Sequence, residues 1–265
     1  MLKRRCFIYV GLSMCALTDF LSGCGGGGNS SSTFSAEAEG FYQGTTSNSK
    51  TVNALVLEDG SLWNIYGVLS ATNLYGAFTG DTFLVEGLST GTSNSTGGIF
   101  SATIKDFHAP GDSVIDGQES GNYVSGSSLN GTIAENGIAT TFTLAVPVQM
   151  TYNYNTPASI GSISGTWSGW LLNGETATIT IAANGLISGA SSLGGCAFSG
   201  TATPRPSGKN VFNVSLTFGN SPCVAANQTV SGIGLTYPLS NGRNQLIFGL
   251  ISASHSQAIA FGAER

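Results

Sequence analysis

Residues 211–218 have the sequence Val211-Phe212-Asn213-Val214-Ser215-Leu216-Thr217-Phe218, and this stretch decides the fold. From Phe212 onward, apolar residues occupy every second position, and Asn, Ser and Thr occupy the positions between them. Successive side chains of a β-strand point to opposite faces, so a period of two predicts a strand with one buried and one solvent-facing side. The segment 176–181 alternates in the same way. Both segments therefore predict a half-buried sheet whose outer face is made of uncharged polar residues.

Turn signals separate many such strand-like segments. Four dipeptides accept the positive φ angles of tight hairpin turns, and strand-like residues flank each of them. They are Asp59-Gly60, Asn136-Gly137, Asn184-Gly185 and Asn241-Gly242. No window after residue 23 has a convincing helical period. The sequence predicts an all-β fold with mostly antiparallel neighbours.

A weak internal repeat indicates two halves. Gly40-Phe41-Tyr42-Gln43-Gly44 parallels Gly165-Thr166-Trp167-Ser168-Gly169, and a predicted hairpin follows each segment. Each half has room for about eight short strands, a number that closes a small barrel without leaving a sheet edge exposed. A sandwich is the alternative, which periodicity does not separate from a barrel. We therefore predict two tandem small antiparallel β-barrels or sandwiches.

Composition sets the expected boundaries of these parts. A stretch from Pro147 to Pro157, with Tyr152-Asn153-Tyr154-Asn155 inside it, is typical of a connector. The predicted parts are a signal peptide over 1–23, a flexible Gly/Ser tether over 24–35, a first β domain over 36–148, a linker over 149–160 and a second β domain over 161–265.

The start of the second half resembles a known group of barrels. Gly165-Thr166-Trp167, followed by a strand-turn-strand pattern, resembles the opening of lipocalin- and avidin-type (calycin-like) barrels. In those families a G-x-W motif closes the base of the barrel and a late basic residue packs over the Trp. The resemblance implies that Arg265 packs over Trp167. The alternative interpretation is that Trp167 is simply an aromatic residue of the core. It implies a fold and does not imply biotin or lipid binding.

The amino-terminal segment predicts export and anchoring. Lys3-Arg4-Arg5 precedes a short apolar run that ends at Leu21-Ser22-Gly23-Cys24, the order of an export signal. The last four residues resemble the bacterial lipobox, which implies that Cys24 is lipidated and begins the mature chain. The apolar run is too short for a membrane span, which needs about 20 residues, and a soluble secreted protein cut nearby is the alternative. In related lipoproteins an Asp after the cysteine directs retention at the inner membrane, so Gly25 implies the outer membrane. The sequence does not indicate whether the protein faces the periplasm or the cell surface.

The remaining cysteines predict a disulfide. Of five cysteines, two would leave with the signal and Cys24 would carry lipid, which leaves Cys196 and Cys223. An even pair in an oxidising compartment favours a disulfide, which would stabilise the fold by about 3 kcal/mol. A metal site would need more ligands, and we expect no cofactor or metal.

Charge excludes one class of partner. Residues 1–23 contain three basic residues and one acidic residue, so the mature chain has 6 basic and 13 acidic residues and a net charge of −7. This balance argues against nucleic-acid binding and against electrostatic attachment to anionic lipids.

Catalytic patterns are weak. His108 and His255 lie far apart in the sequence, and neither has a nearby cysteine or paired carboxylates. The segment Gly111-Asp112-Ser113-Val114 faintly resembles the nucleophile block of SGNH-type hydrolases, in which Ser113 would be the nucleophile. Those enzymes also need an Asp-x-x-His pair near the chain end, and Ser252 stands where that Asp would be. We therefore expect no enzymatic activity.

One acidic segment suggests a calcium alternative. Asp106, Asp112, Asp116 and Glu119 lie close together in a loop-like stretch, and carboxylate oxygens are calcium ligands. Their spacing does not match an EF-hand, and a solvated loop explains them equally well.

The chain as a whole resembles glycine-rich, two-part lipoproteins of Gram-negative bacteria, a group with no assigned activity. The resemblance rests on Cys24-Gly25-Gly26-Gly27-Gly28, the Gly40–Gly44 opening and the late cysteine pair. We expect a membrane-anchored envelope lipoprotein with a non-enzymatic binding or structural role, whose partner is a protein or a glycan of the cell envelope. The alternative is a small-ligand carrier with a calycin-like barrel. The sequence singles out no ligand-binding residues.

Overall fold

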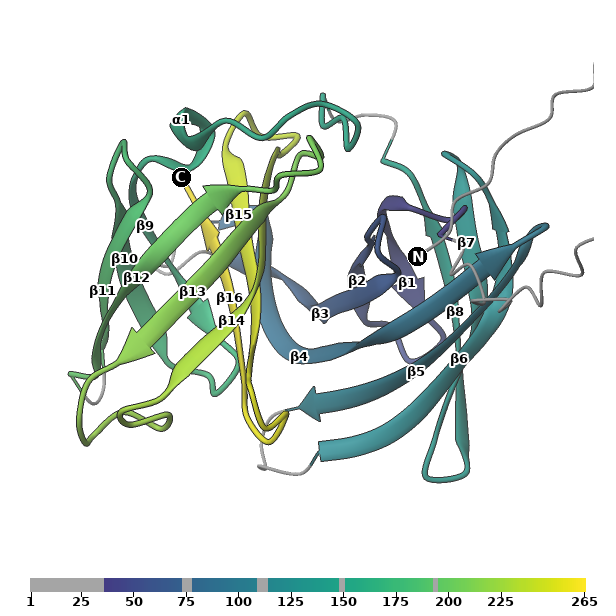
Figure 1. Ribbon diagram of the computed structural model, residues 1–265, viewed down its shortest axis with the longest axis horizontal. Coiled ribbons are helices and arrows are strands. Elements are labelled where there is room, and N and C mark those ends of the chain that lie inside the picture. The colour runs from purple at the N-terminus through teal and green to yellow at the C-terminus, as the bar shows by residue number, and fades with distance from the viewer. Residues whose placement is uncertain (1–35, 73–77, 109–113, 148–150, 193–194) are drawn as a thin grey trace, which may run out of the picture. The chain divides into compact units, whose positions relative to one another are not determined.

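The computed structural model describes residues 36–265 except 73–77, 109–113, 148–150 and 193–194 (Figure 1). These residues form two closed antiparallel barrels of eight strands each, which confirms the all-β prediction and selects barrels over sandwiches. The first barrel contains β1 (Gly40–Thr46), β2 (Thr51–Val56), β3 (Ser61–Thr72), β4 (Phe78–Thr96), β5 (Ile99–His108), β6 (Val114–Val124), β7 (Ser128–Glu135) and β8 (Ile138–Ala145). The second contains β9 (Gly165–Leu171), β10 (Thr176–Ile181), β11 (Leu186–Ser191), β12 (Ala197–Pro204), β13 (Phe212–Phe218), β14 (Thr229–Pro238), β15 (Asn244–Ser252) and β16 (Ala258–Glu264).

Each strand pairs with its neighbours in sequence, and the first and last strands of each barrel pair to close it. β1 pairs with β8 from Gln43↔Ala145 to Thr46↔Phe142, and β9 pairs with β16 from Leu171↔Phe261 to Ser168↔Glu264. The four predicted dipeptide turns lie between paired strands, and their glycines have φ of 77°, 79°, 83° and 81°. Closure leaves neither sheet with a free edge.

The interior of the second barrel is filled by apolar side chains. In β13, Phe212, Val214, Leu216 and Phe218 are buried, as their alternation predicts. They pack with Trp167, Ile179 and Phe248 among others in one cluster. An apolar void of about 30 Å³ remains, enough for a water molecule and far below the 300 Å³ or so of a ligand pocket. The carrier alternative therefore finds no support in this barrel.

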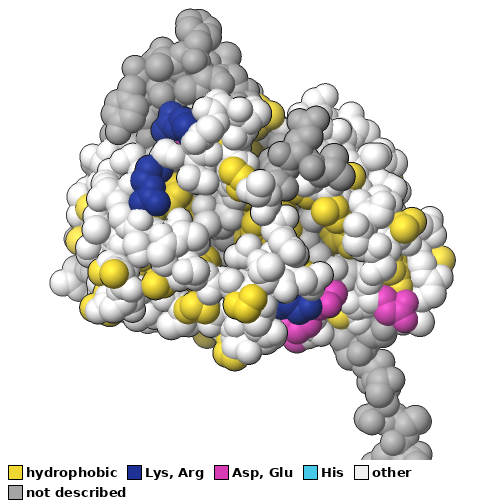
Figure 2. All heavy atoms as spheres, turned by 90° about the horizontal axis from the view of Figure 1, so that it is seen from above, with side chains coloured by type: hydrophobic (Ala, Val, Ile, Leu, Met, Phe, Trp, Pro, Cys, Tyr) yellow, Lys and Arg dark blue, Asp and Glu magenta, His cyan; other side chains and the backbone are white. Residues whose placement is uncertain are grey.

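The first barrel has a mixed interior. Tyr42, Phe100, Leu129 and other apolar side chains form its core. Other inward positions of this barrel carry buried polar side chains, including Asn64, Asp106 and Glu119, which are described below. The outer strand faces carry Ser, Thr and Asn, and Figure 2 shows one face of the molecule with few charged side chains and scattered hydrophobic ones.

A third apolar cluster joins the barrels, and we call it the barrel–barrel core. It forms because β2 and β3 carry apolar residues on their outer as well as their inner faces, and β4 adds apolar residues on its outer face. Its members are Phe41, Leu55, Leu57, Trp63, Ile65, Phe83, Val85 and Leu88 from the first barrel, Ile233, Leu235, Tyr237, Ile247 and Ala260 from the second, and Tyr154 and Val211. A Cβ added at Gly249 of β15 would lie 3.2 Å from Leu88 and 3.3 Å from Ile65 and Trp63, so this glycine permits the close approach.

Polar contacts surround the barrel–barrel core. The Tyr237 hydroxyl donates to Asn53 Oδ1 at 2.9 Å. Arg205 donates to Glu58 at 2.7 Å and to Asp59 at 2.6 Å. Burial acts to raise the pKa of both carboxyls, but Arg205 lowers the pKa of Glu58, and Ser61 together with Arg205 lowers the pKa of Asp59. Charged hydrogen bonds of this kind fix orientation. The barrels thus share one continuous packed structure.

The predicted linker is partly ordered against the barrels. Tyr154 is buried, and its hydroxyl donates to Glu58 at 3.3 Å. One helical turn, α1 (Ile160–Ile163), precedes β9. No helix within the described ranges has the length and hydropathy that crossing a bilayer requires. Whether 36–148 and 161–265 fold as separate domains stays a prediction.

Candidate functional site

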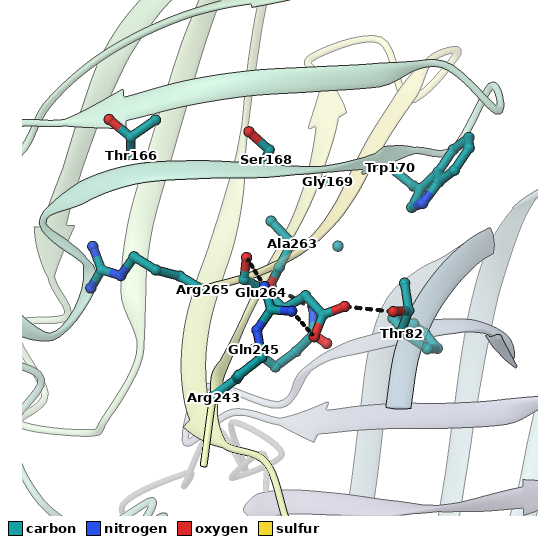
Figure 3. Close-up of a pocket in the computed structure, with 12 residues that line it drawn as sticks. Thr82, Thr166, Ser168, Gly169, Trp170, Arg243, Gln245, Ala263, Glu264 and Arg265 are labelled. Atoms are coloured by element: carbon teal, nitrogen blue, oxygen red, sulfur yellow. Dashed lines mark hydrogen bonds and ion pairs between the residues drawn. The ribbon is translucent and has the colours of Figure 1, made fainter. Parts of the chain in front are cut away.

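The strongest candidate site is a hollow of about 360 Å³ where β4 of the first barrel meets β9, β15 and β16 of the second (Figure 3). Its lining comprises Thr82, Phe83, Thr166, Ser168, Gly169, Trp170, Arg243, Gln245, Gly262, Ala263, Glu264 and Arg265. The volume falls within the range of small-molecule sites in proteins. We call this space the hollow.

A glycine makes the barrels meet here. Gly262 pairs with Trp170 in the β16–β9 register. A Cβ added at Gly262 would lie 3.0 Å from Val85 Cγ2 and 3.2 Å from the Phe83 carbonyl oxygen. A larger residue would push β4 away from β16, so the glycine sets the depth of the hollow.

One wall of the hollow is a compensated ion pair. Arg243 Nη1 lies 3.5 Å from Glu264 Oε2, and Arg243 Nη2 donates to the Glu264 carbonyl oxygen at 3.3 Å. Thr82 of the first barrel donates to Glu264 Oε1 at 2.5 Å. The Glu264 side chain is 8% exposed. The pair therefore supplies polarity to the hollow without a net charge of its own.

Three polar atoms of the lining are buried without a hydrogen-bond partner among the described residues. They are the donor Trp170 Nε1 and the acceptors Gln245 Oε1 and Glu264 Oε2, the last of which has an ion pair with Arg243 at 3.5 Å. Gln245 is 1% exposed, and its Nε2 donates to the carbonyl oxygens of Leu246 at 3.1 Å and Ala263 at 2.8 Å. These two bonds fix the amide, so Oε1 remains as the acceptor. Buried polar atoms normally have partners, so each exception needs an explanation.

Beside the hollow, the base of the second barrel is closed as the calycin resemblance implied. The Arg265 guanidinium lies over the Trp167 ring, 4.2 Å from its centroid, and donates to the Ser164 carbonyl oxygen. Trp167 is fully buried and its Nε1 donates to Ile163 at 2.7 Å. The predicted packing of Arg265 over Trp167 is confirmed. This arrangement commits the Arg265 guanidinium to a structural role.

The predicted disulfide is also present in the second barrel. Cys196 and Cys223 are bonded, with an S–S distance of 2.05 Å and a Cα–Cα distance of 4.7 Å. Both cysteines are buried. The bond ties the start of β12 to the segment between β13 and β14, away from the hollow's lining residues.

A second polar group, which we call the acid cluster, consists of Asp106, Glu119 and Glu135 inside the first barrel. Asn64 donates to Glu119 Oε1 at 2.6 Å, and the Tyr66 hydroxyl lies 2.9 Å from both oxygens of Asp106. Burial, reinforced by the neighbouring acids, raises the pKa of Glu119 to about 8. Burial and Asp106 raise the pKa of Glu135 to about 7.

Opposing effects act on the pKa of Asp106. Burial raises its pKa, although the hydrogen bond that it accepts from Tyr66 and the nearby His108, whose Nδ1 lies 3.3 Å away, both act to lower it. The cluster thus concentrates three carboxyls with raised pKa values, a feature of both functional sites and structural networks.

The structure separates most of the sequence-derived catalytic and calcium candidates. Asp106 and Glu119 point into the barrel, whereas Asp116 points outward, pairs with Lys105 at 2.7 Å and is 80% exposed. His255 lies exposed in the turn between β15 and β16. Among the described residues, no three His, Cys, Asp or Glu side chains group so that they could hold a metal ion. Asp112, Ser113 and Cys24 lie outside the described residues.

Sequence reasoning missed the hollow because its residues come from four strands. One signal was available: Gln245 and Glu264 are polar residues in or at the end of otherwise apolar strands. Such a residue predicts either a strand end or a buried polar contact, and only the structure distinguishes the two.

Comparison with known proteins finds no matching family model and no matching curated protein sequence. Among solved structures, one match is isotype 1 transferrin binding protein B from serogroup B Neisseria meningitidis, with 11% identity and a TM-score of 0.26. It covers 82% of this chain, and this chain spans only 65% of that one. Another is a DUF3598-family protein of unknown function from Nostoc punctiforme, with 11% identity, a TM-score of 0.24 and coverage of 85% of this chain and 93% of that one. Similarity at this level carries no inference about function.

Proposed function

We propose that this chain is a lipid-anchored envelope protein that binds a macromolecular partner at the hollow and catalyses no reaction. The observation that carries the proposal is a set of three buried polar atoms without a hydrogen-bond partner, Trp170 Nε1, Gln245 Oε1 and Glu264 Oε2, in a concave space outside both barrels. A site outside the barrels is accessible to part of a large molecule. By comparison, the void lined by described residues inside the second barrel measures about 30 Å³ and is apolar.

The anchor in this proposal is Cys24. Leu21-Ser22-Gly23-Cys24 after a basic start and an apolar run supports lipidation, and a multiply acylated cysteine would hold the chain firmly because each buried methylene contributes about 0.8 kcal/mol. Gly25 supports placement at the outer membrane. The lining of the hollow supports a binding role, because its ion pair and hydroxyls position a ligand and include no nucleophile activated by a base.

Photocrosslinking at the hollow tests this proposal. A benzophenone amino acid replaces Thr166, an exposed lining residue, in the full chain within intact envelopes. The matched control places it at Gln118, an exposed residue on the outer face of β6 in the first barrel. We expect a discrete high-mass adduct from the Thr166 position alone. No adduct at Thr166, or the same adducts at both positions, would refute the proposal.

A further inference from the structure

The three lining atoms without a hydrogen bond define what a ligand must offer. Trp170 Nε1 is a donor and needs an acceptor, whereas Gln245 Oε1 and Glu264 Oε2 are acceptors and need donors. Leaving such groups buried and unpaired is unfavourable. A ligand that both accepts and donates hydrogen bonds would satisfy all three.

The charges of the hollow favour a neutral ligand. Arg243 is paired with Glu264, and Glu264 also accepts from Thr82. The Arg265 guanidinium is held by Trp167 and the Ser164 carbonyl oxygen, and Figure 3 shows it pointing away from the Arg243–Glu264 pair. A charged ligand would therefore meet charges that already have partners.

We propose that the hollow binds a neutral saccharide unit, carried on the macromolecule assigned under the proposed function, on which this inference rests. A sugar hydroxyl is both donor and acceptor, so the hydroxyls of a saccharide can pair with the donor Trp170 Nε1 and with the acceptors Gln245 Oε1 and Glu264 Oε2. The Trp170 indole presents an apolar surface for the C–H face of a pyranose. Thr166 and Ser168 add hydroxyls to the same lining.

A peptide amide also donates and accepts, but the fold favours the saccharide. Extended peptides bind by adding a strand to a free sheet edge. β9 is paired on both sides, with β10 and with β16, so the hollow offers no free edge there. A peptide at this position would lose its main source of affinity.

Fluorine NMR on the full chain in detergent micelles tests the saccharide proposal. The chain is labelled with 5-fluorotryptophan at its three tryptophans, Trp63, Trp167 and Trp170. The probes are the methyl glycosides of glucose, galactose, mannose and N-acetylglucosamine. We expect at least one glycoside to shift the Trp170 signal saturably while the signals of the buried Trp63 and Trp167 stay in place.

A variant then tests the hydrogen bond itself. Trp170→Phe keeps an aromatic wall and removes the N–H, so the Kd for that glycoside, measured by calorimetry, should rise about tenfold. Gln118→Ala, on the outer face of the first barrel, should leave it unchanged. An unchanged Kd in Trp170→Phe would overturn the proposed contact.

The remaining outcomes separate this inference from the proposed function. If no glycoside shifts Trp170, or if only the neutral peptide N-acetyl-dialanine methylamide does, the saccharide proposal is wrong. An adduct from Thr166 without any glycoside response would overturn the saccharide proposal alone and would still support the binding of a macromolecular partner. A glycoside response without an adduct would support the saccharide and refute the macromolecular partner.

Discussion

Replacing Glu119 by Gln should change how the stability of this protein depends on pH. Glu119 is 3% exposed inside the first barrel and accepts a hydrogen bond from Asn64 at 2.6 Å. Burial, with help from Glu135 and Asp106, raises its pKa from 4.5 to about 8. Glutamine has nearly the same shape, can accept the Asn64 bond through its own Oε1 and does not ionise.

The sign follows from comparing the folded and unfolded chains. Below about pH 4 both hold the proton, so the Glu119 contribution to stability is fully present. Between pH 4.5 and about 8 the unfolded carboxyl is ionised while the folded one keeps its proton, so stability falls as pH rises and levels off above about 8. The loss from this one group amounts to about 5 kcal/mol at most.

Urea unfolding at a series of pH values measures the effect. Glu119→Gln should be increasingly stabilised over the wild type between about pH 5 and pH 8, by up to about 5 kcal/mol. Titration of Glu135 occurs in both chains and largely cancels in the difference. Asp116→Asn is the matched control, because Asp116 lies on the same strand with an 80% exposed side chain. Parallel stability curves for wild type and Glu119→Gln would show that the buried carboxyl does not hold its proton.

Three further changes test other parts of the structure. Replacing both Cys196 and Cys223 by Ala should lower the free energy of unfolding by about 3.5 kcal/mol, because the bond closes a loop with a sequence separation of 27; a loss below about 1 kcal/mol in urea unfolding would contradict a structural disulfide. Trp63→Ala removes a 7% exposed side chain from the barrel–barrel core and should cost about 3–5 kcal/mol, whereas a near-zero cost in the same assay would mean that the barrels are not packed together. Cys24→Ser should move the chain from the membrane to the soluble fraction in cell fractionation, and retention with the membrane would exclude the lipid anchor.

The sequence predicted the fold well where each strand has one apolar face. The alternation in residues 212–218 matches the burial in β13, and the Xaa-Gly turns lie where hairpins require positive φ. The disulfide was also predicted from the cysteines, because the expected signal removal and lipidation leave only one pair. These features depend on local patterns, which a sequence displays directly.

The barrel–barrel core could not be predicted in the same way. β2 and β3 carry apolar residues on both faces, and a run such as Ala54–Leu57 looks the same whether the second face packs on another barrel or on a helix. The acid cluster could not be predicted for a related reason. The sequence pattern indicated a loop around Asp106 and Glu119, and only the strand register places both side chains inside the barrel. The hollow depends on Gly262 facing β4, a long-range contact that no local pattern reports.

The most direct test of the binding account is the chemical accessibility of the hollow in the native envelope. Cysteine placed at Thr166, in the lining, and at Gln118, on the outer face of the first barrel, is labelled with a maleimide in intact envelopes and again after purification. The account predicts slow labelling at Thr166 in the envelope that becomes fast once the partner is removed, with Gln118 fast in both. Equal labelling of Thr166 in both states would contradict the claim that this hollow is occupied by a partner.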